Sequence, residues 1–263
     1  MIRAVSHMTE LEAFDCDALG CSVISSAAAY GFRTAAVRFW CGNGFAIRLQ
    51  DGTAVLCGTV DADDREELRE FLSCIRADTL LCREENACRL HFSFTNSSLE
   101  MELQGDIPAQ EKDLCFASSN QTDHDLCLSD MYRLLAACAL PDFSVPPFES
   151  FYLDMSHRIR HRAVLAAGAQ KNHALCACAA ADLSPKQALL FSGAALPAVR
   201  GSKMFSSVLS ALTEKAGKQR TLLLCGKYLR KHYEQMGFSV CGRVVQTPLT
   251  NLVFGKKVSS GKS

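Results

Sequence analysis

The chain has 263 residues and a mass of 28.7 kDa, enough for two modest domains. Its 28 basic and 28 acidic residues give a formal net charge of zero, which argues against a nucleic-acid partner bound through a broad basic surface. The start, MIRAVSHMTELEAFD, lacks the apolar core of a secretory signal, and no apolar run reaches the about 18 residues of a membrane span. We therefore expect a cytoplasmic protein with no membrane partner.

The first half of the chain is expected to mix helices and strands. A helix is predicted over residues 10–31, ending at Gly31, and Asp51-Gly52 predicts a hairpin between two strand-like runs. The acidic first turn and apolar spacing of residues 61–77 predict a second helix. The other expected elements are strands at AVRFWCG, GFAIRLQDG, TAVLCGTV, RLHFSF and SLEMEL, a polar loop over 104–125 and a helix over 126–139.

A proline-rich stretch marks the expected domain junction. Three of the seven prolines fall within LPDFSVPPFE, residues 140–149. Proline continues neither a helix nor a central strand, so a linker is the natural interpretation. The expected domains are an α+β unit over residues 1–145 and a second unit over residues 146–263.

The second half predicts an α/β (α+β) unit with a mixed sheet. Two strand runs are joined by a hairpin at residues 168–172, and the helix over 202–216 ends at Gly217. A strand on each side of that helix implies a parallel pair. The expected elements are strands at HRAVLAAG, HALCACAAADL, QALLFSGAAL, TLLLC, FSVCGRVV and LTNLVFG, and helices at 202–216 and KYLRKHYEQMG.

Fourteen cysteines are spread along the chain, mostly inside apolar strings such as Cys176-Ala-Cys178. Thiols stay reduced in the cytoplasm, and buried cysteine behaves as a small apolar residue. No CxxC pair occurs, so we expect structural thiols rather than a metal site or a disulfide framework.

The stretch RGSKMFSSVL, residues 200–209, is a candidate phosphate-binding turn. A strand followed by a turn that opens a helix directs free backbone N–H groups and the positive end of the helix dipole at whatever lies above the turn. Arg200 and Lys203 would add full positive charges, which suits a pyrophosphate. A plain strand-to-helix turn with solvated basic residues is the alternative.

Residues 150–256 resemble the GCN5-related N-acetyltransferase (GNAT) superfamily. The resemblance rests on the order of the elements, on the strand and turn ALLFSGAAL–PAVRGSKMF, and above all on HYEQMGF, residues 232–238. The family pattern is a strand, an Arg/Gln-x-x-Gly-x-Gly/Ala turn, a long helix, a strand, and a helix ending in a Tyr-Glu-x-x-Gly-Phe-like segment. A GNAT fold preceded by an α+β domain is the implied fold.

The resemblance implies acetyl-CoA as co-substrate. Backbone groups of the strand end would align the pantetheine arm, amides near Leu196 would polarise the thioester carbonyl, and N–H groups of the turn would meet the pyrophosphate. The implied cofactor-binding residues are Gly193, Ala194, Ala195, Leu196, Arg200, Gly201, Ser202, Lys203, Met204 and Phe205.

Three positions depart from the family pattern. The two glycine positions of the turn hold Lys203 and Phe205, although glycine there lets a ligand approach the backbone. Leu229 stands where the family often has an asparagine. These departures lower the expected affinity for the co-substrate.

Tyr233 is the candidate catalytic residue, because the family's tyrosine often protonates the departing thiolate. A tyrosine that only packs with its hydroxyl bonded is the alternative. No base is evident: QALLFSGAAL carries no carboxylate, and Ser192 is its only hydroxyl. Water, an imidazole or a neutral amine would then have to serve.

Polar residues gather in FYLDMSHRIRHR, residues 151–162. In the family, the segment entering the early strands commonly lines the acceptor site. Either this stretch is a solvated basic linker, or it binds an acceptor with a carboxylate or phosphate. The histidine spacing matches part of a zinc pattern, but the glutamate of HExxH is absent, so no metal is expected. The acceptor-site candidates are Asp154, His157, Arg158, Arg160 and His161.

The leading interpretation is an acetyl-CoA-dependent N-acetyltransferase in which a small-molecule or peptide amine attacks the thioester directly. Two alternatives stay open: a GNAT-fold binding or interaction module without transfer activity, and transfer from another acyl-CoA. Residues 1–145 read either as a worn GNAT-like half, which would make a tandem protein, or as a plain packing domain. A homodimer is compatible with these interpretations.

Overall fold

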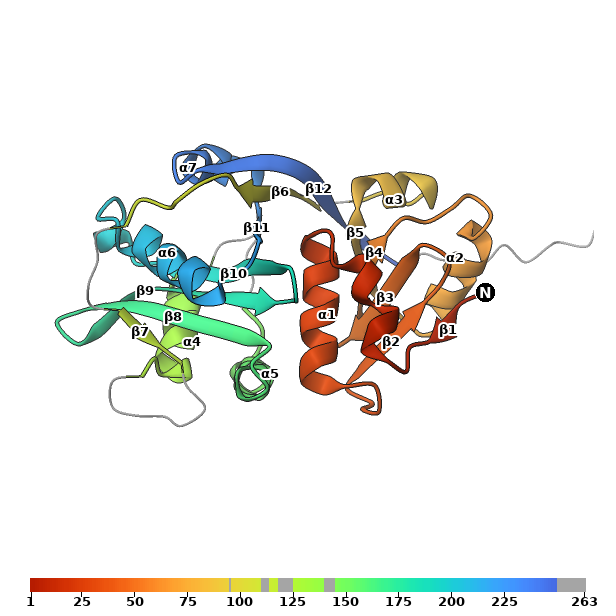
Figure 1. The fold of residues 1–263 in the computed structure, drawn as a ribbon, viewed down its shortest axis with the longest axis horizontal. Coiled ribbons are helices and arrows are strands. Elements are labelled where there is room, and N and C mark those ends of the chain that lie inside the picture. The colour runs from red at the N-terminus through yellow and green to blue at the C-terminus, as the bar shows by residue number, and fades with distance from the viewer. Residues whose placement is uncertain (95, 110–113, 118–124, 140–144, 250–263) are drawn as a thin grey trace, which may run out of the picture.

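The computed structural model describes residues 1–94, 96–109, 114–117, 125–139 and 145–249. These residues form a twelve-stranded mixed sheet with helices on its faces (Figure 1). The elements of the first half are β1 (Arg3–Ala4), α1 (Ala18–Tyr30), β2 (Val37–Cys41), β3 (Phe45–Gln50), β4 (Thr53–Gly58), α2 (Arg65–Cys74), β5 (Thr79–Arg83), α3 (Glu84–Arg89) and β6 (Asn96–Leu103).

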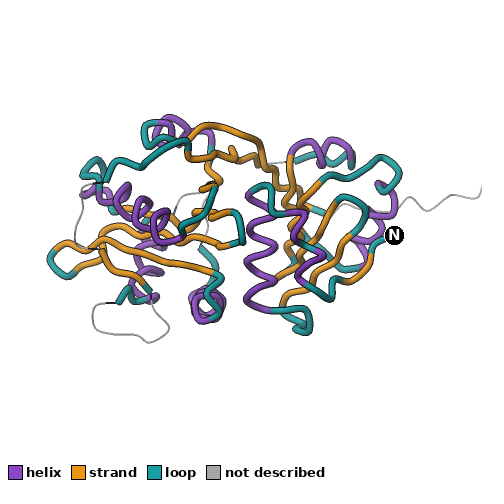
Figure 2. The backbone as a smooth tube through the Cα atoms, in the orientation of Figure 1, coloured by secondary structure: helices purple, strands orange, loops and turns teal. Residues whose placement is uncertain are grey.

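In the second half, helices and strands follow one another in a similar order; Figure 2 colours the two kinds of element. Its elements are β7 (Leu114–Phe116), α4 (Leu128–Ala137), α5 (Phe148–Arg160), β8 (Val164–Lys171), β9 (Ala174–Leu183), β10 (Gln187–Ala195), α6 (Met204–Ala216), β11 (Arg220–Cys225), α7 (Arg230–Glu234) and β12 (Phe238–Pro248).

The strand order is β1-β2-β3-β4-β5-β12-β6-β11-β10-β9-β8-β7. Its two halves, each read from its own edge of the sheet towards the centre, place corresponding strands in the same order. Each strand therefore has its counterpart six strands later, at the mirrored place in the sheet. The parallel pair β4–β5 corresponds to the parallel pair β10–β11. The chain thus consists of two units of one topology, β1–β6 and β7–β12.

The two units exchange their last strands. β12 pairs with β5 of the first unit, and β6 pairs with β11 of the second. In Figure 1 these two strands run across the top of the molecule between the two halves. The second unit begins at β7, before the domain boundary expected between residues 145 and 146, and that boundary stays a prediction.

Small residues let helices pack on both faces of the second unit. Along β9, Ala177, Ala179 and Ala181 face the α6 side chains of one core cluster. The alternate residues Cys178 and Ala180 face α4 and α5 in another. A strand with small residues on both faces allows close helix approach, which accounts for the Ala- and Cys-rich sequence of β9.

Several sequence expectations need correction. The helix expected from residue 10 begins only at Ala18, where the carboxylate of Asp17 accepts the N–H of Gly20 at 2.7 Å. The strand expected at RLHFSF is wrong, since that stretch holds the last residue of α3, a turn and residues without regular structure. The nearby strand is β5, which precedes α3. The hairpin expected at residues 168–172 turns instead at Asn172 and His173, both with positive φ.

Two other outcomes concern the ends of the units. β7 lies inside the stretch expected to be a loop. β12 runs to Pro248, and all but the first residue of the strand expected at LTNLVFG lies outside the described residues. Within the described ranges, no helix is long and apolar enough to cross a membrane.

Candidate functional site

The site begins where β10 and β11 part. Their parallel pairing runs from Gln187 opposite Arg220 to Leu190 opposite Leu223 and then stops. Beyond that point β10 has a bulge between Phe191 and Ala194, with Ser192 at a φ of 50°. A bulge bends its strand, so the end of β10 leaves its neighbour and a gap opens between the two strands.

The turn that follows β10 presents unbonded amides. Gly201 and Lys203 have φ values of 84° and 67°, and α6 starts directly after them. In the part of the chain that the structure describes, the N–H groups of Gly201, Lys203, Met204 and Phe205 donate to no backbone carbonyl. No atom lies within 4 Å of a Cβ built at Gly201, so the backbone is open there. Such an arrangement fits an oxyanion.

Lys203 adopts the backbone conformation that explains the family's glycine. Its φ of 67° lies in the left-handed region, which costs an L-residue free energy that glycine does not lose. No side-chain cap completes the start of α6. The lysine therefore keeps the geometry of the turn, at a cost in stability.

Phe205 reaches across the gap. A Cβ built on Gly193 of β10 would lie 2.9 Å from Cζ of Phe205, so the ring packs directly on that glycine. The ring also stacks on His232 of α7, with 6.3 Å between the ring centroids. A ligand arm aligned along Gly193 would meet this ring. The turn thus fits a pyrophosphate, whereas the path along β10 requires the Phe205 side chain to move.

Tyr233 lies on α7 against the same core. Its ring packs edge-on against the ring of Phe238, with 5.9 Å between the ring centroids. The Cys225 thiol and Tyr228 lie nearby. Burial, reinforced by these two neighbours, holds the pKa of Tyr233 well above its usual range. The hydroxyl therefore keeps its proton at neutral pH, as a proton donor must and as a packed tyrosine also would. Leu229, in place of the family's asparagine, is partly buried in this core.

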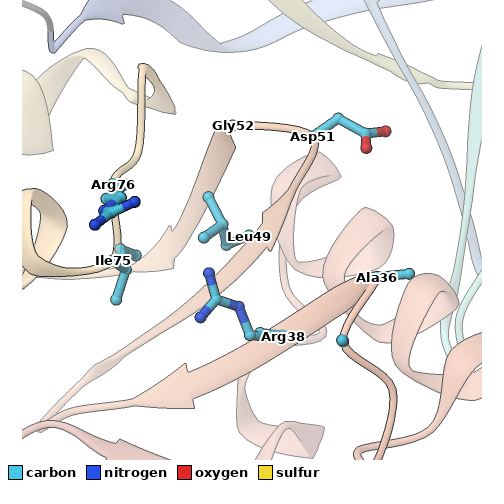
Figure 3. A pocket seen from close by; sticks show the side chains of 8 residues that line it. Ala36, Arg38, Leu49, Asp51, Gly52, Ile75 and Arg76 are labelled. Carbon is cyan, nitrogen blue, oxygen red and sulfur yellow. The ribbon is translucent and has the colours of Figure 1, made fainter.

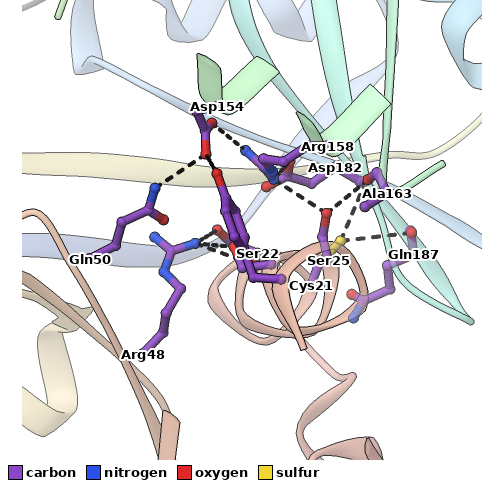
Figure 4. A network of polar contacts seen from close by, with 12 residues as sticks. Cys21, Ser22, Ser25, Arg48, Gln50, Asp154, Arg158, Ala163, Asp182 and Gln187 are labelled. Atoms are coloured by element: carbon purple, nitrogen blue, oxygen red, sulfur yellow. Dashed lines mark hydrogen bonds and ion pairs between the residues drawn. The ribbon is translucent and has the colours of Figure 1, made fainter. Parts of the chain in front are cut away.

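Two acceptor-site candidates on α5, Asp154 and Arg158, lie at the contact with the first unit (Figure 4). Asp154 accepts hydrogen bonds from the hydroxyl of Tyr30 at 2.6 Å and from Nε2 of Gln50 at 3.2 Å. Arg158 is buried, pairs with the buried Asp182 and lies 5.7 Å from the ring centroid of Phe191 beside the bulge. The positive charge of Arg158 is therefore already compensated inside the protein.

Of the remaining acceptor-site candidates, one contacts the first unit and two are exposed to solvent. His157 hydrogen-bonds the carbonyl of Ala29 at 3.0 Å and stacks on Tyr30. His161 is exposed beside His157, and Arg160 is exposed with its Nε bonded to the carbonyl of Ser156. The structure thus brings Asp154, His157 and Arg158 together against α1, and their binding role stays a prediction.

No protein-family model and no curated protein matches the sequence, but solved structures match the fold over most of the chain. One is a tandem GNAT protein from the clavulanic acid biosynthesis pathway, with 14% identity, a TM-score of 0.57, and 94% of this chain and 97% of that chain covered. A GCN5-related N-acetyltransferase from Kribbella flavida matches with 13% identity, a TM-score of 0.59 and coverage of 89% and 95%.

A GNAT-family acetyltransferase from Colwellia psychrerythraea matches with 15% identity, a TM-score of 0.55, and coverage of 94% of this chain and 99% of that chain. These matches span both units of the chain. The chain has a tandem GNAT fold. At the level of the fold, this confirms the resemblance seen in the sequence and the interpretation of the first half as a GNAT-like unit.

The first GNAT unit is filled at the place that corresponds to the turn of the second. There, at the end of β4, the side chain of Asn86 from α3 bonds the backbone. It donates to the carbonyl of Gly58 at 2.9 Å and accepts the N–H of Val60 at 3.1 Å. The loop that follows carries Asp61, Asp63 and Asp64. Negative charge repels a pyrophosphate, so this turn of the first unit is not suited to one, unlike the turn at Arg200–Lys203 in the second unit.

In the second GNAT unit, the amide proposed for polarising the carbonyl is engaged. The N–H of Leu196 donates to the carbonyl of Cys176 at 2.9 Å, continuing the ladder with β9. Arg200 also turns back, its Nε donating to the carbonyl of Ala195 at 3.4 Å. A donor to a substrate carbonyl would therefore have to be a group other than the Leu196 amide.

Sequence reasoning missed the partners of the α5 cluster. Besides Tyr30 and Gln50, they include Asp182. Arg48 lies close to the cluster, and its Nη1 donates to Oγ of Ser22 and of Ser26 on α1. Burial, together with nearby Arg158, lowers the pKa of Arg48 to about 10. One signal was available, because Asp182 is a lone carboxylate in the apolar run ALCACAAADL. In the described part of the chain, no group of three or more His, Cys, Asp or Glu side chains is placed to hold a metal.

Proposed function

We propose that this protein is an N-acetyltransferase that moves the acetyl group of acetyl-CoA to a small-molecule or peptide amine in its second GNAT unit. The observation that carries the proposal is the unbonded N–H group set of Gly201, Lys203, Met204 and Phe205, placed just beyond the strand end that parts from β11. A turn of this kind, beside such a gap, suits a ligand that has both a pyrophosphate and an extended arm.

The same geometry supports the roles proposed for the other residues. Arg200 and Lys203 add positive charge beside the turn, and Gly193 to Leu196 offer the strand edge along which the arm would lie. Bound acetyl-CoA supplies the thioester, whose C–S bond breaks as the new N–C bond forms. Tyr233, which holds its proton at neutral pH, donates it toward the sulfur. The proton lost by the amine goes to water, because β10 carries no carboxylate.

The acceptor would enter on the α5 side of β10. Arg158 lies there against Phe191, beside the bulge, and Asp154, His157 and Tyr30 line the contact with the first unit. The first unit would then form one wall of the acceptor site. Arg160 and His161 are exposed at the end of α5 and would meet an anionic part of the acceptor at the entrance.

A second candidate function is a GNAT-fold module that binds a partner without transferring an acetyl group. The position of Phe205 favours it, because the ring lies on Gly193 where the arm would run. In this case the fold is kept while the path of the co-substrate is filled.

A thermal-shift titration with acetyl-CoA, CoA and adenosine 3′,5′-bisphosphate tests the proposal. A ligand present at about 100 times its Kd stabilises a protein by about 2.7 kcal/mol, which shifts the melting temperature measurably. Shifts with both CoA forms support the transferase. No shift at millimolar ligand contradicts it and favours the module.

Tyr233→Phe then separates binding from chemistry. Thiol release from acetyl-CoA is followed with a panel of amines, for the wild-type protein and the variant. The transferase predicts a fall in kcat with an unchanged Kd for acetyl-CoA, because the phenyl ring keeps the packing on Phe238. An unchanged kcat would rule out Tyr233 as the proton donor.

A further inference from the structure

A hollow of about 220 Å³ lies on the first unit, far along the chain from the residues assigned to acetyl transfer. It is bounded by the start of β2, the turn between β3 and β4, and the end of α2 (Figure 3). Its lining includes Arg38, Leu49, Asp51, Gly52, Ile75 and Arg76. No residue of the second unit contributes to the lining.

Two guanidinium groups give this hollow its charge. Figure 3 shows the side chains of Arg38 and Arg76 at the hollow, while the carboxylate of Asp51 is turned away from both. Among the residues that the structure describes, neither arginine has an acidic partner within ion-pair distance. Two guanidinium groups without a counter-charge attract an oxyanion, for which the planar fork of arginine is well shaped.

The Arg38 side chain is held in place before any ligand arrives. Its guanidinium carbon lies 5.2 Å from the ring centroid of Trp40. Trp40 in turn meets Phe71 of α2 edge-on, with 5.2 Å between the centroids. Stacking on a fixed ring restricts the guanidinium and leaves its N–H edge available, which lowers the entropy lost on binding.

The turn itself does not account for Arg76. This residue follows α2 with a φ of 57°, where glycine is favoured. At the corresponding end of α6, the second unit has Gly217 with a φ of 58°. The helix thus ends at a residue of positive φ in both units, glycine in one and arginine in the other, and the arginine lies at the hollow.

We propose that this hollow binds a small oxyanion, the carboxylate or phosphate group of a compact molecule. Arg38 and Arg76 meet the charged oxygens, and the apolar part of the ligand lies on Leu49 and Ile75. The site is separate from the proposed transfer site and does not depend on the proposed activity. It gives the first unit, which lacks a turn suited to pyrophosphate, a ligand of its own.

Titration calorimetry on the full chain tests this site. Inorganic phosphate is the first probe, at constant ionic strength maintained with chloride, followed by phenyl phosphate and benzoate. The variants are Arg38→Gln and Arg76→Gly, with Arg162→Gly as the matched control. Arg162 is an exposed arginine with a φ of 58° after α5, outside the hollow, so its replacement relieves the same backbone strain.

The expected result is saturable binding of phosphate that weakens at least tenfold in both hollow variants and is unchanged in Arg162→Gly. Arg76→Gly should melt no lower than the wild-type protein, which excludes unfolding as the cause. The tighter of phenyl phosphate and benzoate identifies the ligand class. Absence of saturable binding overturns the proposal. Binding that survives both hollow variants also overturns it, because that binding belongs to the turn at Arg200–Lys203.

Discussion

The ring of Phe205 packs on the backbone of Gly193, and a Cβ at that glycine would come within 2.9 Å of the ring. This contact joins the start of α6 to the part of β10 that has left β11. It places an aromatic side chain across the one stretch of backbone that the proposed co-substrate would follow. The two candidate functions therefore differ in whether this ring moves away from Gly193 when acetyl-CoA is present.

Shortening this side chain should open the path. We expect Phe205→Ala to bind acetyl-CoA at least about tenfold more tightly than the wild-type protein, a gain of about 1.4 kcal/mol. Removing a half-buried ring should also lower the free energy of unfolding by about 2 kcal/mol. Calorimetric titration and urea unfolding measure the two effects.

Phe205→Leu is the matched control, because it keeps most of the bulk over Gly193. Its affinity for acetyl-CoA should stay near that of the wild-type protein. Equal affinity in Phe205→Ala and the wild-type protein would show that the ring does not limit binding.

Lys203→Gly should stabilise the protein. The lysine has a φ of 67°, and glycine adopts this conformation without the steric cost, so a gain of about 1 kcal/mol is expected. For a chain of this size that corresponds to a rise in the melting temperature of about 2–4 °C. Lys218→Gly is the control, because Lys218 has no positive φ and should lose stability or stay unchanged. A fall in the melting temperature of Lys203→Gly would mean that the lysine side chain makes a stabilising contact.

Much of the second unit could be predicted from its sequence, because its signals are local. The apolar spacing of α6 and the glycine after it predict that helix, and the turn at Arg200–Lys203 follows from it. Lys203, at the family's glycine position, has a φ of 67°, a backbone conformation that favours glycine. What the sequence did not show is where Phe205 points, since that depends on Gly193 and His232 in two other elements.

The exchange of strands could not be predicted, for a physical reason. Pairing of β12 with β5 joins residues such as Val245 and Cys82, which are far apart in the chain and share no local signal. β5 itself is five residues long, is followed directly by α3, and has no glycine or proline in the turn that separates it from α2. The polar contacts between the units were hidden in the same way, because Asp154 gives no sign of its partner Tyr30.

Asp182→Asn should be strongly destabilising. Asp182 and Arg158 are both buried, and replacing the carboxylate leaves the guanidinium without its main counter-charge. Removing one partner of a buried ion pair costs about 3–5 kcal/mol. Urea unfolding measures the change. Asp154→Asn is the control, because that carboxylate is more exposed and lies 3.4 Å from Arg158, so its loss should cost less. Equal losses in both variants would contradict a dominant role for Asp182.

Alkaline pH should destabilise the fold through its buried thiols. Burial raises the pKa of Cys82 and of Cys178 to about 12, and that of Cys225 to about 11, from 9.0. In the unfolded chain these thiols ionise near pH 9, while in the folded chain they stay protonated. The folded state then binds more protons, so the free energy of unfolding falls as the pH rises above about 9. Each such thiol contributes a slope of up to about 1.4 kcal/mol per pH unit.

Urea unfolding at several pH values between neutral and pH 10.5, under reducing conditions, measures this slope. Cys82→Ala should make it shallower, because one buried thiol no longer titrates on unfolding. Cys88→Ala is the matched control: Cys88 is exposed on the neighbouring helix α3, so its replacement should leave the slope unchanged. If Cys82→Ala and Cys88→Ala changed the slope equally, burial of the thiols would not be the cause of alkaline unfolding. Tyr233, whose pKa is also raised, would then be the next group to test, with Tyr233→Phe.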